Sequence, residues 1–244
     1  MGEGSLSEQR LELAAWLGHK AARAALPEGP PPARRFDFLL RRLRQAGKPA
    51  LVRAALAGVR SAGGSPHAHS AAGLALSWLA APSEELAQRA AALAAELERP
   101  WQEAWSCPRP GAPAGVVPYS SRSSWSPASV ELWSLGAALY AARVVAGEVR
   151  GSPNTRSEAP VFSSTQNADR SLTYARFALC GPGHDQHICK LTPNHGASVV
   201  VASPEWRAAE QSAQAKLFAA LGAELVPWLL GDWALSPHQS RDRT

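Results

Sequence analysis

The alanine-rich stretch from residue 71 to residue 105 constrains the fold most, because prolines interrupt it at Pro82 and Pro100. Alanine is the strongest helix former, whereas proline lacks a backbone N–H and disfavours helical geometry in the residue before it. We therefore expect one helix that ends before Pro82, a second that begins at the N-cap Ser83, and a break at Pro100. Apolar residues at spacings of three and four give the second helix one stripe, made of Leu86, Ala90, Leu93, Ala94 and Leu97. This stretch predicts close packing between helices rather than chemistry.

Similar periodicity predicts helices in most of the remaining chain. Gly47 should end one helix and Pro49 should open the next, since glycine favours helix C-termini and proline fits the first turn. The expected helices outside the central stretch are Glu8 to Leu26, two within Arg34 to Arg60, Ala128 to Val149 and Pro204 to Leu225. Two short runs of alternating or β-branched residues, Ser171 to Cys180 and Ser198 to Ala202, favour strands instead.

Together these patterns predict a mainly α-helical protein, either an irregular multi-helix bundle or a short helical array. A small β-hairpin is expected within residues 171–202, where the two strand-like runs could pair around the loop between them. Residues 1–150 are expected to form a helical domain. Residues 151–244 are expected to form a loop-rich segment that carries the hairpin and a C-terminal helix packed on the first part.

Between Ala75 and Glu96 the chain also carries a characteristic order of motifs. They are Ala75-Leu76-Ser77-Trp78-Leu79, Pro82-Ser83-Glu84-Glu85, Arg89-Ala90-Ala91 and Ala94-Ala95-Glu96. This order resembles that of small uncharacterised helical proteins of GC-rich bacteria, in which a proline-rich link and another alanine-rich helix follow. Here the link is Cys107 to Pro118 and the later helix is Val130 to Val149. Such proteins are similar to those encoded beside type VI secretion loci or among toxin-immunity genes. The resemblance therefore implies an immunity or secretion-accessory role and no known active site.

Composition narrows the compartment and the class of protein. The chain has 244 residues, a hydrophobic content of 45% and a net charge of +5, which fits a globular protein with a sizeable core. Three cysteines do not make a disulfide framework and favour a reducing compartment. No run of 18 apolar residues predicts a membrane span, and the N-terminus lacks the basic-then-apolar order of a signal peptide. We expect a bacterial cytoplasmic protein that does not act at a membrane.

One loop contains the right residue types for a metal ion. Cys180, His184, His187 and Cys189 supply two thiols and two imidazoles, the ligands and the number that tetrahedral zinc prefers. A Gly-Pro-Gly turn between them would let the chain fold back on an ion. The spacing matches no common zinc signature, however. The sequence leaves two alternatives, a plain polar loop without a cofactor and a module stabilised by zinc.

The most basic segment runs from Arg34 to Arg60, where Asp37 is the single acidic residue. Basic side chains on a helix could contact nucleic-acid phosphates, and they could equally cover apolar surface with their stems on a solvated face. No helix-turn-helix or zinc-finger spacing accompanies them. The candidate nucleic-acid-binding residues are Arg34, Arg35, Arg41, Arg42, Arg44 and Lys48.

No motif of a common enzyme class is present: the sequence has no GxSxG elbow, HExxH, P-loop or GxGxxG. The chain has nine tryptophans, more than packing alone needs, and tryptophan is enriched at binding hot spots. We therefore predict a non-enzymatic helical protein that binds another protein. The expected contact residues are Trp101, Trp105, Tyr119 and Trp125.

Overall fold

The computed structural model describes residues 3–24, 36–106, 127–147, 163–181 and 204–231. Within these ranges the regular structure is helical and no strand occurs, which confirms the mainly α prediction. The helices are α1 (Glu3–Trp16), α2 (Lys20–Ala24), α3 (Phe36–Gln45), α4 (Lys48–Ser61), α5 (Pro66–Ala80), α6 (Glu84–Ser106), α7 (Pro127–Ala146), α8 (Ser164–Cys180) and α10 (Pro204–Leu230).

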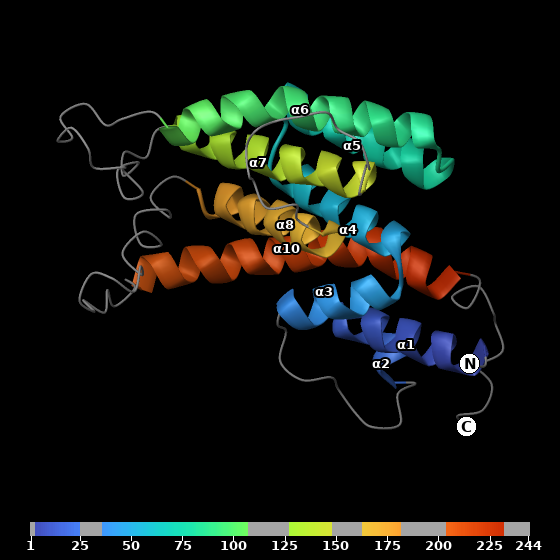
Figure 1. The fold of residues 1–244 in the computed structure, drawn as a ribbon. Helices are drawn as coiled ribbons and strands as arrows, with labels where there is room; N and C mark the ends of the chain where they lie inside the picture. Colours follow the sequence, from blue (N-terminus) through green and yellow to red (C-terminus); the bar gives the residue numbers. More distant parts are fainter. Residues whose placement is uncertain (1–2, 25–35, 107–126, 148–162, 182–203, 232–244) are drawn as a thin grey trace, which may run out of the picture.

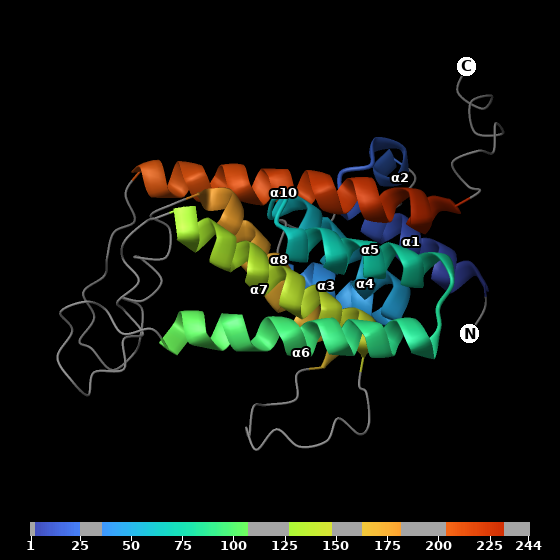
Figure 2. The ribbon, with the colours of Figure 1, turned by 90° about the horizontal axis from the view of Figure 1, so that it is seen from above.

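The helices pack around α4, which contacts α5, α7, α8 and α10 (Figure 1). From Ala50 to Val59 every residue of α4 except Arg53 is buried, which places this helix in the core. Helices α5, α6 and α7 lie on one side of α8 and α10, and α1 to α3 lie on the other side. Seen from above, the long helix α10 runs along one edge of the molecule and α6 runs along the opposite edge (Figure 2).

Small residues allow α4, α7 and α8 to approach closely. At Gly58 of α4, an added Cβ would lie 3.3 Å from the side chain of Leu172 in α8. The buried hydroxyl of Ser171 in the same helix donates a hydrogen bond of 3.0 Å to the carbonyl of Ala137 in α7. The later helices α8 and α10 thus pack directly on helices from the first part of the chain.

Several predicted helix ends are confirmed. Helix α4 begins after the N-cap Gly47, with Pro49 in its first turn. The hydroxyl of Ser83 accepts a hydrogen bond of 3.2 Å from the backbone N–H of Leu86 at the start of α6. In each case a residue with a strong local backbone preference sets the boundary, so the sequence alone locates it.

The predicted strand from Ser171 to Cys180 is wrong, because these residues form the second half of α8. The hydroxyl of Ser163 accepts from the N–H of Gln166 at 3.3 Å, and the side chain of Gln166 accepts from the N–H of Ser163 at 2.8 Å. This capping box starts the helix upstream of the run that resembles a strand. The other predicted strand, residues 198–202, lies outside the described residues.

Two predicted helix boundaries also differ from the structure. Pro100 does not end α6, which continues to Ser106. Proline removes one intrahelical hydrogen bond, and burial of Trp101 in the next position holds the following turn in place. The expected helix from Glu8 is interrupted at Gly18, whose φ of 97° ends α1, and the ring nitrogen Nδ1 of His19 accepts from the N–H of Ala22 in α2.

Among the helices of the described ranges, none is both long enough and apolar enough to cross a lipid bilayer.

Candidate functional site

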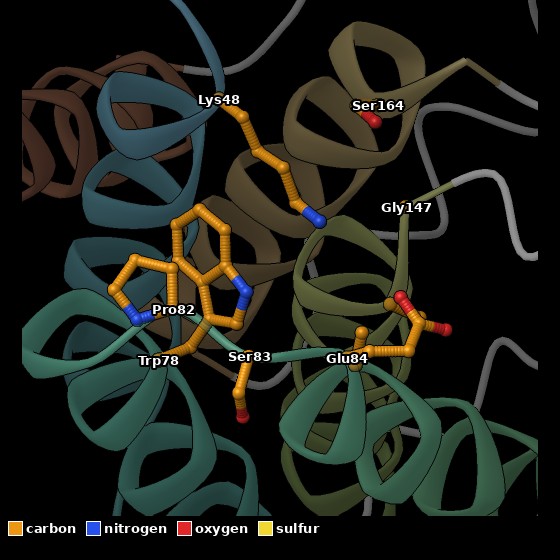
Figure 3. A pocket seen from close by; sticks show the side chains of 9 residues that line it. Lys48, Trp78, Pro82, Ser83, Glu84, Gly147 and Ser164 are labelled. Carbon is orange, nitrogen blue, oxygen red and sulfur yellow. The ribbon is translucent and has the colours of Figure 1, made fainter.

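A hollow of about 560 Å³ opens where the ends of several helices meet. Figure 3 shows Lys48 at the start of α4, Trp78 near the end of α5 and Glu84 at the start of α6 around this hollow. Gly147 follows the end of α7, and Ser164 is the first residue of α8. We call this site the Lys48 hollow; its lining residues are Lys48, Trp78, Pro82, Ser83, Glu84, Ala87, Ala146, Gly147 and Ser164.

Local sequence signals set the helix ends around the hollow. Each helix that borders it starts or stops at a residue that favours a helix end. Pro82 follows the end of α5, and Ser83 then caps α6. Helix α7 ends at Gly147, whose φ of 71° is costly for residues with a side chain. The capping box at Ser163 fixes the first residue of α8. Local sequence therefore sets where these helices end, and the packing of the helices brings the ends together.

The amino group of Lys48 is the central charged group of the hollow. Its Nζ lies 4.7 Å from the centroid of the Trp78 ring, within the range of a cation–π interaction. Nζ also lies against Gly147, where an added Cβ would be 3.0 Å away. Because Gly147 stands at the C-terminal end of α7, the negative end of that helix dipole favours the ammonium there.

Lys48 has no carboxylate within 4.0 Å among the residues that the structure describes. Partial burial lowers the pKa of its amino group, and the negative charge of Glu84 partly offsets this effect. An ammonium without an ion pair in a partly desolvated position can gain energy from an incoming anion.

Some of the other polar groups of the hollow favour an anion, and one favours a cation. The first turns of α6 and α8 are positive ends of helix dipoles and favour anions, and Ser164 adds a hydroxyl beside them. The carboxylate of Glu84 is exposed and accepts a long hydrogen bond of 3.5 Å from Gln88, one turn further along α6. The hollow can therefore attract an anion near Lys48 and a cation near Glu84.

Of the predicted partner-binding residues, only Trp101 has its side chain in the described part of the chain. Trp101 is only 6% exposed and belongs to the core, where its ring lies 4.8 Å from Tyr174 between centroids. Trp105 is in the last turn of α6, but its side chain lies outside the described residues, as do Tyr119 and Trp125. Burial of Trp101 places it in packing rather than at a contact surface.

Only Cys180 of the predicted metal ligands lies in the described part of the chain; His184, His187 and Cys189 lie outside it. Its thiol is at the end of α8 and donates a hydrogen bond of 3.5 Å to Glu210 in α10. Burial, together with the negative charge of Glu210, raises the pKa of Cys180 to about 12. The described residues hold no group of three or more metal-ligating side chains, and the zinc alternative stays a prediction.

The basic segment has several different environments. Arg42 forms an ion pair of 3.0 Å with Glu12 of α1, and Arg44 is exposed. Lys48 faces the hollow. Arg41 is in α3 but its side chain lies outside the described residues, and Arg34 and Arg35 precede that helix, also outside them. Nucleic-acid binding by this segment stays a prediction.

The sequence predicts some boundary residues of the hollow, but not the ends of α7 and α8 at Gly147 and Ser164, and not the hollow itself. Pro82 and Ser83 were identified as a helix stop and a helix start, and Lys48 as one member of a basic run. The predicted helix ends next to Lys48 and next to Glu84 are the sequence signal that points to these two residues. The tertiary fold is needed to bring these ends together.

Comparison of the chain with protein-family models, with curated proteins and with solved structures found no match in any of the three.

Proposed function

We propose that this chain is a non-enzymatic binding protein whose binding site is the Lys48 hollow, and that the bound group is an anion. The carrying observation is the position of the Lys48 ammonium. It stacks on Trp78 at 4.7 Å and faces a hollow of about 560 Å³. It also has no carboxylate within 4.0 Å in the described part of the chain.

The lining of the hollow supports recognition. It offers two opposite charges, hydroxyl groups, helix ends and an aromatic ring, and ligand sites use such convergent polar groups to fix the orientation of what they bind. The hydroxyl of Ser83 is already engaged as a helix cap. Our proposal therefore assigns the hollow to binding and names no reaction.

The biological setting proposed here follows from the sequence. A bacterial cytoplasmic location and an immunity or secretion-accessory role are what the cysteine content and the family resemblance favour. In such a role the bound anion would be a group on a protein partner or on a small effector molecule. In both cases it would bind in the Lys48 hollow.

The proposal can be tested by calorimetric titration with acetate, succinate and inorganic phosphate at pH 7 and fixed ionic strength. We expect at least one of these probes to bind, and Lys48→Met to weaken it about tenfold or more, as for loss of a charge-assisted hydrogen bond. Lys216→Met is the matched control, because Lys216 is exposed on α10 and does not line the hollow. Equal losses in the two variants would refute the assignment.

A further inference from the structure

The Lys48 hollow holds two opposite charges that do not pair with each other. Glu84 influences the pKa of Lys48 through its charge, yet the two side chains form no ion pair within 4.0 Å. Figure 3 shows their charged ends on different sides of the same hollow. Among the residues that the structure describes, each charge is therefore available to a ligand group of the opposite sign.

Different elements hold the two charges apart. Stacking on Trp78 and the C-terminal end of α7 position the amino group of Lys48. Glu84 lies in the first turn of α6, where the helix dipole favours a carboxylate. Apolar groups also line the hollow, from Pro82, Ala87 and Ala146 together with the Trp78 ring.

Resting on the proposed function, we propose that the ligand of the hollow is a small zwitterion, a free α-amino acid. Its carboxylate binds Lys48 and its ammonium binds Glu84, while its side chain lies on the apolar wall. A simple anion would gain attraction from Lys48 but would meet repulsion from Glu84, and a simple cation would meet the reverse. A zwitterion satisfies both charges, and a hollow of about 560 Å³ is within the size range of small-molecule sites.

The experiment is a calorimetric titration of the full chain with the twenty common amino acids. Each amino acid that binds is then compared with its N-acetyl derivative and with its carboxamide, at pH 7 and fixed ionic strength. The N-acetyl derivative lacks the positive charge and the carboxamide lacks the negative charge. We expect each derivative to bind about tenfold or more weakly than the free amino acid, since each loses one charge-assisted contact.

Variants assign each charge to a residue. In Glu84→Gln the preference for the free amino acid over its N-acetyl derivative should shrink to about threefold or less, whereas in Lys48→Met the preference for the free amino acid over its carboxamide should shrink in the same way. Glu85→Gln is the matched control, because Glu85 is the exposed neighbour on α6 and does not line the hollow. It should retain the full preference, and circular dichroism melting of every variant checks that it folds.

The outcomes separate this inference from the proposed function. If no amino acid binds, or if Glu84→Gln keeps the preference, the zwitterion is wrong. Phosphate or acetate binding that depends on Lys48 would then still support the anion site. If neither the amino acids nor the simple anions bind in a manner that depends on Lys48, both proposals fail.

Discussion

Gly136→Ala in the middle of α7 should destabilise the fold, although alanine is normally the better residue in a helix. Gly136 faces the ring of Trp101 in α6, and an added Cβ would lie 2.5 and 2.7 Å from two carbons of that ring. Ordinary contacts of this kind are about 3.5–4.0 Å, so the ring must move by about 1 Å to admit the methyl group.

Trp101 has little room to move. Its ring makes aromatic contacts with Tyr174, Trp133 and Tyr140, with centroid separations of 4.8, 6.4 and 6.4 Å. Forcing an extra methyl group into such a core costs about 1–3 kcal/mol, and replacing glycine by alanine in a helix returns about 1 kcal/mol. We therefore expect a net loss of up to about 2 kcal/mol in the free energy of unfolding.

The matched control is Gly73→Ala in α5, because a Cβ at Gly73 would meet nothing within 4 Å. This substitution should stabilise the protein by about 0.5–1 kcal/mol through helix propensity alone. Both variants are measured by urea unfolding followed by far-UV circular dichroism, with attention to a constant m-value. The difference between the two substitutions isolates the cost of the clash.

A double-mutant cycle tests the assigned cause. In a Trp101→Leu background the ring is absent, so Gly136→Ala should no longer destabilise, and the coupling energy should be about 1 kcal/mol or more. If Gly136→Ala stabilises the unaltered protein as much as Gly73→Ala does, the aromatic cluster is more adaptable than the packing implies. A steric clash between residue 136 and the Trp101 ring would then be refuted.

Four further outcomes are expected. Ser163→Ala removes the capping box of α8 and should cost about 1 kcal/mol of stability in the same urea assay, whereas Ser163→Asp should restore most of it. The thiol of Cys180 should react much more slowly with iodoacetamide at pH 8 than an exposed cysteine, as followed by peptide mass mapping, since its pKa is raised to about 12. Glu210→Gln should accelerate this reaction, because it removes a negative charge that raises the pKa. The folded pKa of Cys180 exceeds the unfolded one, so its contribution to stability should be constant below pH of about 8.5 and should fall as the pH rises toward 12.

The helix ends that the sequence predicts correctly depend on one or two neighbouring residues. Gly47 with Pro49, and Pro82 with Ser83, restrict the backbone whatever the rest of the chain does. Pro100 has the same local preference but is overruled, because Trp101 beside it is buried by residues distant in sequence. The local signal failed where long-range packing was the stronger effect.

The error at residues 171–180 has a related cause. Alternation of Leu172 and Tyr174 with smaller residues is typical of a strand, but the buried positions Ala168, Leu172 and Ala175 follow helical spacing. The capping residue Ser163 lies outside the run that favours a strand. Together, the cap at Ser163 and the residues that follow it favour a helix from residue 164 onward.

The candidate site is less predictable than the fold because its residues are far apart in sequence. Lys48, Glu84, Gly147 and Ser164 belong to four helix ends. The sequence gives Lys48 a local explanation as part of a basic segment and Glu84 one as a first-turn carboxylate, whereas the expected helix from Ala128 to Val149 runs past Gly147 and no helix start is predicted at Ser164. Only the packing of α7 against α6 and α8 shows that they share one hollow. The proposed site combines residues whose local roles are structural.

The geometry of α7 further predicts that stability and binding can be changed separately. Gly136 lies in the aromatic cluster, and Gly147, 11 residues later, borders the hollow about 16 Å along the helix axis. Gly136→Ala should therefore lower stability and leave Lys48-dependent anion affinity nearly unchanged. Gly147→Ala should cost about 1 kcal/mol of stability, because its φ of 71° disfavours a side chain. It should also weaken anion binding, because the new Cβ would lie 3.0 Å from Nζ of Lys48 and displace it. A loss of anion affinity in Gly136→Ala equal to that in Gly147→Ala, at a temperature where both remain folded, would show that binding depends on the whole bundle rather than on the position of the Lys48 amino group.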